Sequence, residues 1–166
     1  MGAAFYACTA LFVVLVLWGM WSDLVSLTIP DAVSIGLMLG FIANAVWAGA
    51  TMGTILHHFA LGGAVFLLGA LLFFLGAFGG GDVKMLAAVA LWAGWPMVVE
   101  LLVRVALLGG LLALALLAFR AISLSAGMQA RPWIARLHRR DGGIPYGIAI
   151  GTGSLLLLPR ITWWQF

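Results

Sequence analysis

The most informative stretch of this sequence is Phe78-Gly79-Gly80-Gly81-Asp82-Val83-Lys84. It places an aspartate on a run of glycines between two strongly apolar segments. The chain has only five acidic residues, and another of them, Asp23, lies where the first apolar run ends. A charge near a bilayer is costly and usually marks a functional site or a paired structural contact. Two scarce carboxylates at the ends of apolar runs therefore predict a site at a membrane face.

Composition indicates the class of protein. The 166 residues are 65% hydrophobic and only 8% charged, and the mean hydropathy is +1.20. Soluble domains carry about 25% charged residues, so this chain has too few charges to cover a surface in water. We expect an all-α, polytopic integral membrane protein that forms a single domain over residues 1–166. Cys8 is the only cysteine, which excludes an internal disulfide and a cysteine-based zinc site.

Apolar runs of up to about 20 residues predict the membrane-spanning helices. Pro30 suits an early helical position, and Pro96 closes a short apolar helix that follows the glycines. Residues 51–59, which include His57 and His58, form a polar break that we expect to be a solvated loop. The six predicted spans are 3–21, 32–50, 60–78, 83–95, 97–119 and 144–158. The Trp163-Trp164 pair after the last span is typical of an interfacial aromatic belt.

Basic residues predict the orientation of these spans. Five of the eight lie in one connecting segment: Arg120, Arg131, Arg136, Arg139 and Arg140. Placing this segment in the cytoplasm satisfies the positive-inside rule, puts Lys84 on the same side and leaves Arg160 outside. Alternate crossings then bring Asp23 and Asp82 to the same cytoplasmic face. Because membrane topology accounts for the positive charge, we expect membrane lipid and no nucleic acid as a partner.

A pair of carboxylates can hydrolyse a peptide bond without a metal, a cofactor or a covalent intermediate. Two like charges about 4 Å apart, at an effective dielectric constant near 20, repel by about 4 kcal/mol. One carboxyl group of such a pair therefore stays protonated, while the other accepts a proton from a water molecule held between them. Asp23 and Asp82 are the candidates for this pair. The two share the acid and base roles as a unit, so neither role is assigned to one residue.

The glycines before Asp82 have two interpretations. Gly79, Gly80 and Gly81 allow positive φ angles and close backbone approach, so a short turn can direct Asp82 toward the first span. The alternative is an ordinary flexible linker in which Asp82 only caps the following helix. The coincidence with Asp23 favours the first interpretation.

Three elements of the sequence have counterparts in a known family. Gly79-Gly80-Gly81-Asp82 matches a G-x-G-D motif that continues as Val83-Lys84. Asp23 is followed, after five residues, by Ile29-Pro30, as in a D-x5-I-P-N element. Pro145-Tyr146-Gly147 matches a P-x-G segment that opens a final span. In this order the elements resemble those of type IV prepilin peptidases, which are membrane-embedded aspartic proteases.

The resemblance implies an aspartic endopeptidase with Asp23 and Asp82 as its catalytic pair. It implies removal of the leader peptide from a prepilin or pseudopilin precursor at the cytoplasmic face of the bacterial inner membrane, with no metal or cofactor. The residues implied to shape the site are Gly79, Gly80, Gly81, Lys84, Pro145 and Gly147.

The chain looks most like the short form of the family that serves tight-adherence (Flp-type) pili. Longer relatives carry an insertion with paired cysteines between the first two spans and also methylate their product. Here that connection is only about ten residues long and contains no cysteine. No methyltransferase activity is therefore implied, and the oligomeric state stays open.

Several charged residues need an interpretation of their own. Asp31 replaces the Asn usual after Ile-Pro, and we interpret it as a capping residue near a helix start. Lys84 is expected to extend to lipid phosphate, the alternative being an electrostatic effect on the carboxylate pair. Glu100 and Arg104 are four residues apart in the fifth predicted span, which favours a structural ion pair.

Two other functions are compatible with these residues. A transporter subunit could move protons or cations on intramembrane carboxylates, and Glu100 would then matter more than Asp23. An inactive scaffold of a pilus assembly could keep the fold without catalysis. The basic segment 131–140 is equally compatible with a short amphipathic helix on anionic lipid and with an irregular loop.

Overall fold

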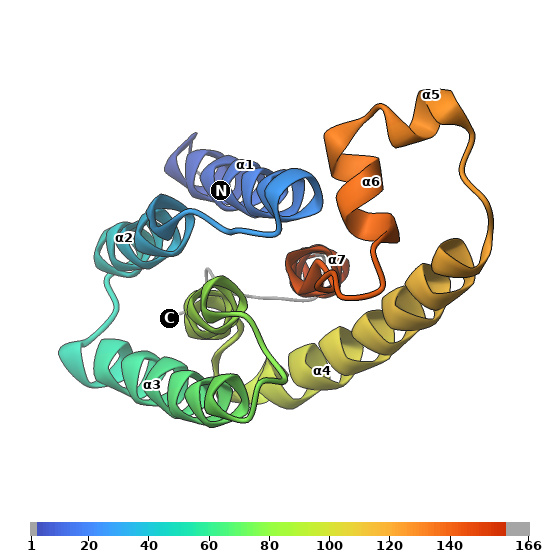
Figure 1. Ribbon diagram of the computed structural model, residues 1–166. Coiled ribbons are helices and arrows are strands. Elements are labelled where there is room, and N and C mark those ends of the chain that lie inside the picture. The colour runs from blue at the N-terminus through green and yellow to red at the C-terminus, as the bar shows by residue number, and fades with distance from the viewer. Residues whose placement is uncertain (1–2, 159–166) are drawn as a thin grey trace.

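Helices make up the regular secondary structure of residues 3–158, which the computed structural model describes (Figure 1). The predicted all-α class is confirmed. The helices are α1 (Ala3–Ser26), α2 (Asp31–Trp47), α3 (Met52–Phe74), α4 (Gly80–Ala121), α5 (Ala126–Gln129), α6 (Pro132–His138) and α7 (Tyr146–Leu157). Arg160 and Trp163-Trp164, used above for the orientation and the aromatic belt, lie outside the described residues.

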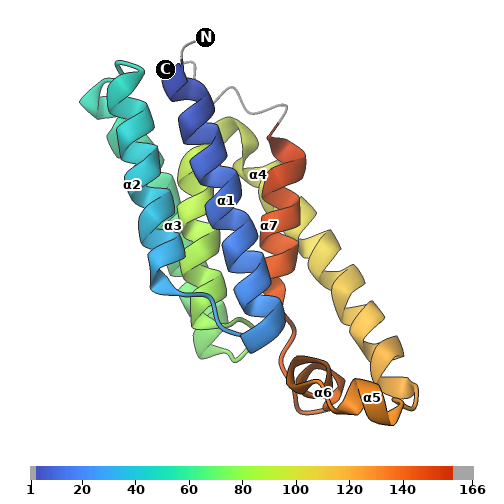
Figure 2. The same cartoon turned by 90° about the horizontal axis from the view of Figure 1, so that it is seen from above.

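The long helices form a bundle, as expected for a multi-pass membrane protein (Figure 2). Three helices, α1 from Tyr6 onward, α3 and α4, are long and apolar enough to cross a membrane, and α2 and α7 are shorter apolar helices. α4 bends at Gly94, and its two limbs run in opposite directions along the bundle. With α4 counted as two limbs, the described chain contains six apolar helical segments, which is the predicted number.

The two ends of the bundle differ in what they carry. The lower end in Figure 2 holds the C-terminal end of α1, the turn between α3 and α4, and the short helices α5 and α6. The upper end holds the connection between α2 and α3 and the bend in α4. The basic segment and the ends of α1 and α4 that carry Asp23 and Asp82 therefore lie at the same end.

The first limb of α4 is the centre of the bundle. Almost every residue from Val83 to Gly94 is buried, because α1, α2 and α3 all pack on this limb. A helix that is apolar on all sides is typical of a packed core or of a membrane span. Trp92 anchors it: its Nε1 donates a hydrogen bond to the Leu37 carbonyl at 2.9 Å, and its ring packs 5.2 Å from that of Phe12. This packing holds the first limb of α4, whose first turn carries Asp82.

α4 bends two residues before Pro96, the residue that we expected to end its first part. Gly94 has φ 63° and ψ 177°, which breaks the helix there, and Pro96 lies in the first turn of the second limb. Proline is tolerated at that position because the first amides of a helix have no intrahelical acceptor. The bend frees the Leu91 carbonyl, which accepts a hydrogen bond of 2.6 Å from Nδ1 of His58.

The prediction of a polar loop at residues 51–59 is wrong. α3 begins at Met52, and Thr51 caps it by accepting a hydrogen bond from the Thr54 amide at 3.1 Å. His57 and His58 therefore lie on the helix, and His58 is half-buried against Phe41. The N-cap threonine, rather than the polarity of the histidines, determines where this span begins.

Replacement of Gly94 by Ala should destabilise the protein by about 1–3 kcal/mol, because φ at this position is left-handed. A methyl group there would also lie 2.9 Å from Cε1 of His58. Thermal unfolding in detergent measures the effect. Gly110→Ala is the matched control, since it lies in the same helix with open space around it. Equal melting temperatures for the two variants would contradict this account of the bend.

The basic segment folds back against the bundle. Its α6 buries Ile134 and Leu137 and exposes Arg136, and Arg131, Arg139 and Arg140 are exposed on either side of it, so the short amphipathic helix predicted as one alternative is present. Arg120 at the end of α4 donates hydrogen bonds to the carbonyls of Leu137, Gly142 and Gly143. These bonds join α4 to α6 and to the chain that leads into α7, and they help to position the start of α7.

Candidate active site

Asp23 lies inside α1, because this helix continues to Ser26 instead of ending near residue 21 as predicted. Its side chain is buried, with 4% of the residue exposed. The Oδ2 atom accepts a hydrogen bond of 2.7 Å from the amide of Gly147, which lies 124 positions away at the start of α7. The first amides of a helix lack intrahelical partners and favour an anion. The start of α7 therefore orients the Asp23 carboxylate.

Asp82 lies in the first turn of α4 and is 7% exposed. Its Oδ2 accepts a hydrogen bond of 3.2 Å from the amide of Gly79, so it does contribute to capping, as the alternative interpretation held. Its Oδ1 is buried and has no hydrogen-bond partner in the described structure. Asp82 also interacts with the charge of Asp23 and with the Gly147 amide. Two carboxylates from helices far apart in sequence thus meet at the start of α7.

The glycines of the motif act by close approach. None of Gly79, Gly80 and Gly81 has a positive φ angle, which corrects one of the roles predicted for them; in the turn before them that conformation belongs to Gly76, with φ 74°. A methyl group on Gly81 would lie 3.1 Å from Cβ and 3.3 Å from N of Ile29. One on Gly79 would lie 2.7 Å from Oδ2 of Asp82, whereas Gly80 has only ordinary contacts.

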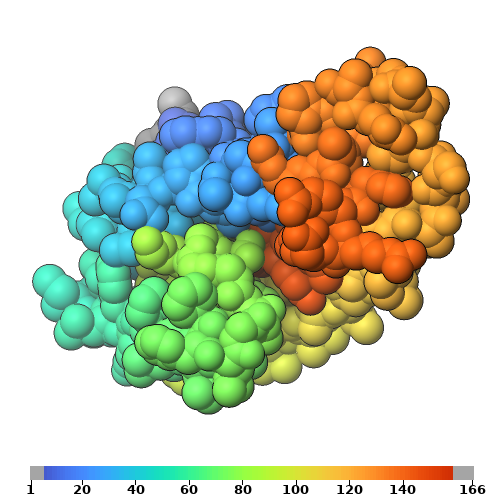
Figure 3. Space-filling model, in the orientation of Figure 1, coloured from blue at the N-terminus to red at the C-terminus, as the bar shows by residue number. Residues whose placement is uncertain are grey.

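Ile29 packs against the motif glycines that lie beside the two carboxylates. A methyl group on Gly147 would lie 2.8 Å from Oδ2 of Asp23 and 2.9 Å from Cδ1 of Ile29, so Ile29 lies against the motif glycines of both α4 and α7. We call residues 27–30, which join α1 to α2, the strap. The Ser22 hydroxyl donates to the Thr28 carbonyl at 2.8 Å and holds the strap against the end of α1. In Figure 3 the end of α1, the strap and the start of α4 lie side by side on this face.

An aromatic stack completes the support of the site. The rings of Phe78 and Tyr146 are stacked with centroids 5.0 Å apart, which joins the turn before α4 to the start of α7. Gly109 in the second limb of α4 makes room for Tyr146, because a methyl group there would lie 2.6 Å from its Cε1. No role was predicted for Ile29, Phe78 or Gly109. Ile29 belongs to one motif and Phe78 directly precedes another, whereas no sequence signal marks Gly109, and the contacts of all three depend on the tertiary structure.

Lys84 and Asp31 form an ion pair instead of the separate contacts predicted for them. Nζ of Lys84 lies 2.7 Å from Oδ1 of Asp31, and both side chains are partly exposed. Asp31 is the first residue of α2, whose N-cap is Pro30, and no side chain caps that helix end. The pair lies on the far side of α4 from the carboxylates, because residues 82 and 84 are about 200° apart on a helix.

Glu100 and Arg104 form the structural ion pair that their spacing predicted, with 2.5 Å between Oε1 and Nη2. Arg104 also donates to the carbonyl of Leu156 at 3.2 Å, which joins the second limb of α4 to the end of α7. Over residues 3–158, no group of three or more His, Cys, Asp or Glu side chains is arranged to hold a metal ion.

Pro145 is buried and is the N-cap residue of α7, so it fixes where that helix starts and where the Gly147 amide points. The structure thus brings together Asp23, Asp82, Gly79, Gly81, Pro145 and Gly147 from the predicted site. Lys84 lies outside this group, and Gly80 contacts Phe73 rather than either carboxylate. The catalytic and site-shaping roles themselves stay predictions.

Comparison with known families agrees with the motifs. The profile of the type IV leader peptidase family matches residues 10–114, which is more than half of the chain and includes both Asp23 and Asp82. No match was found among curated proteins or among solved structures. A membrane-embedded bundle with two carboxylates buried side by side is consistent with this match, and the chain belongs to the type IV leader peptidase family.

Proposed function

We propose that this protein is a membrane aspartic endopeptidase that removes the leader peptide of Flp-type prepilins or pseudopilins at the cytoplasmic face of the bacterial inner membrane. The observation that carries the proposal is the meeting of Asp23 and Asp82 beside the Gly147 amide. Neither carboxylate is paired with a lysine or arginine among the described residues. A buried ionised carboxylate without a cation is costly, whereas two carboxyl groups that share one proton are a catalytic unit.

The reaction follows from the two hydrogen bonds that orient the pair. Gly147 holds Oδ2 of Asp23 and Gly79 holds Oδ2 of Asp82, so the other oxygens can hold a water molecule. One carboxylate takes a proton from this water as its oxygen attacks the peptide carbon. The protonated carboxyl group donates its proton toward the carbonyl oxygen, and the tetrahedral intermediate then releases the amine after a proton transfer to nitrogen. No residue other than the pair needs to change its charge.

The position of the basic segment supports the cytoplasmic orientation. It lies at the same end of the bundle as the carboxylates, and positive charge gathers on the cytoplasmic side of membrane proteins. The connection between α1 and α2 supports the short, Flp-type form. It consists of the four-residue strap and leaves no place for an inserted domain between these helices.

The proposal is tested by co-expression with a small pilin precursor encoded near its gene. Mass spectrometry of the pilin should show loss of the leader when the peptidase is present and none when it is absent. A pilin that keeps its leader, with the peptidase present in the membrane fraction, would argue against the proposed substrate.

Replacement of Glu100 by Gln distinguishes peptidase from transporter. Because Glu100 is paired with Arg104 and is not part of the carboxylate pair, leader removal should stay within about twofold of wild type. Immunoblots of pilin processing, normalised to peptidase abundance, measure it. A larger loss of processing in Glu100→Gln than in Asp23→Asn would instead favour proton or cation transport.

A further inference from the structure

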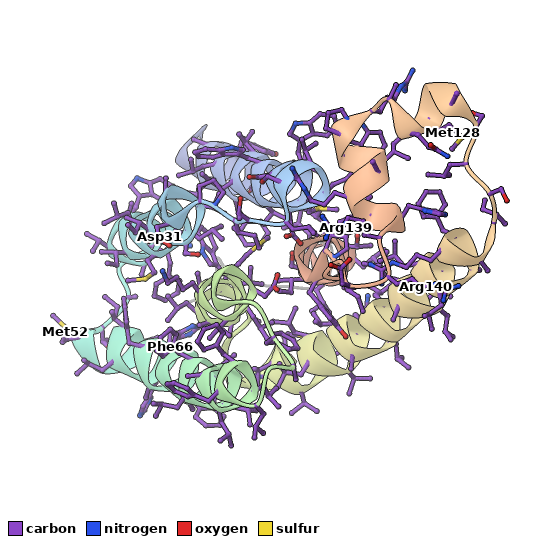
Figure 4. All side chains as sticks on the ribbon, viewed as in Figure 1. Asp31, Met52, Phe66, Met128, Arg139 and Arg140 are labelled. Carbon is purple, nitrogen blue, oxygen red and sulfur yellow. The ribbon has the colours of Figure 1, made fainter. Side chains whose placement is uncertain are left out.

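A second feature of the bundle is an apolar groove of about 430 Å³ between α2 and α3, with the first limb of α4 as its floor. Figure 4 marks Asp31 and Phe66, which border the groove on α2 and α3. Lys84, Ala87, Ala88 and Leu91 form the floor and follow the i, i+3, i+4, i+7 pattern of one helix face. The floor is therefore about 10 Å long, or two turns of a helix.

Small side chains line this groove where a guest backbone has to come close. Gly63 faces open space, since a methyl group there would meet no atom within 4 Å. Ala87 and Ala88 lie on the floor. Association of helices in a membrane depends on close approach at small residues. The groove therefore has the surface that a transmembrane helix needs.

The polar groups at the groove do not favour a charged lipid. Ser34 lines it, but its Oγ is buried and is not presented at the surface. The ion pair of Lys84 with Asp31 is neutral overall, so it offers no net charge to an anionic lipid head group.

The groove ends at the depth of the carboxylates. Lys84 borders that end and follows Asp82 by two residues, which is about 3 Å along the helix axis. The strap connects the two places, because its Ile29 lies against Gly81 and Gly147 beside the carboxylates, and Asp31, which follows the strap, borders the groove. A helix seated in the groove therefore has its cytoplasmic end beside the strap.

We infer that this groove binds the apolar transmembrane segment of the precursor. The inference rests on the proposed function and adds where the substrate is held. The seated helix packs on Gly63, and the chain that precedes it crosses the strap to reach Asp23 and Asp82. Substrates that lack an apolar segment lose this binding contribution.

Filling the groove tests this inference. Gly63→Leu places a large side chain in it, and Gly110→Leu places the same side chain in open space on the second limb of α4. We measure the ratio of kcat/KM for the whole precursor to that for a short soluble peptide across the cleavage site. The ratio should fall at least tenfold in Gly63→Leu and keep its wild-type value in Gly110→Leu.

Equal ratios in the two variants would overturn the inference that the groove binds the precursor, but would leave the proposed peptidase function intact. If the wild-type protein cleaves neither substrate, the proposed function itself fails, and the inference fails with it. A Gly63→Leu variant that loses both activities in proportion would also count against the groove, because the loss would then not depend on the apolar segment.

Cross-linking gives a second measurement that does not depend on activity. The background carries Cys8→Ala and Asp82→Asn, and either Gly63→Cys or Gly110→Cys is added to it. Membranes that contain each variant and a precursor with one cysteine in its apolar segment are then treated with an oxidant. A disulfide to the precursor should form at least fivefold more with Gly63→Cys. Equal yields would mean that lipid occupies the groove, and a Gly63→Cys homodimer would mean a second copy; either result overturns the inference.

Discussion

Asp82→Asn and Asp23→Asn should each reduce the rate of leader removal by at least about 10²-fold, because general acid–base groups contribute about 10²–10⁴-fold to the rate of a reaction. Asparagine keeps the size of the side chain and can accept the same backbone hydrogen bonds from Gly79 and Gly147. It cannot take a proton from water. The measurement is the fraction of co-expressed pilin that has lost its leader, normalised to the amount of peptidase in the membrane.

The double variant is informative because the two groups act as one unit. Asp23→Asn combined with Asp82→Asn should be little worse than either single change, since effects of residues that act together are not additive. Asp141→Asn is the control. This carboxylate is exposed, and the hydrogen bond from Arg139 lowers its pKa, so the change removes a surface charge only. Wild-type processing by both Asp23→Asn and Asp82→Asn would show that the protein does not use an aspartic protease mechanism.

Replacement of Gly147 by Ala should reduce leader removal by about 10²-fold, the cost of displacing a reacting group by about 1 Å. The added methyl group would lie 2.8 Å from Oδ2 and 3.0 Å from Cβ of Asp23, closer than non-bonded atoms allow. Either Asp23 or the start of α7 has to move, and the 2.7 Å hydrogen bond between them is then lost. Processing assays together with thermal unfolding separate this local effect from loss of the fold.

Gly143→Ala is the matched control for this change. It lies four residues earlier, and a methyl group there would meet only Cδ1 of Leu27 at 3.8 Å, an ordinary contact. This variant should process the precursor at the wild-type level. Full activity of Gly147→Ala would show that its amide does not position Asp23.

Much of the candidate site could be predicted because its signals are local in the sequence. The shortage of charge identified the membrane class, and scarce aspartates beside glycine and proline motifs identified the carboxylates and the segments around them. Helix limits were less predictable where a cap or a bend overrides composition. Thr51 begins α3 ahead of the two histidines, and Gly94 bends α4 before Pro96 is reached.

Hydropathy and short motifs act over neighbouring residues, so they predicted a helical membrane protein and identified the two acids that are candidates for catalysis. Three further features depend on how distant segments pack: the Gly147 amide orients Asp23, Ile29 lies against the motif glycines, and Lys84 binds Asp31. These contacts join residues up to 124 positions apart. Their geometry depends on how buried helices pack, and no local pattern in the chain specifies that packing.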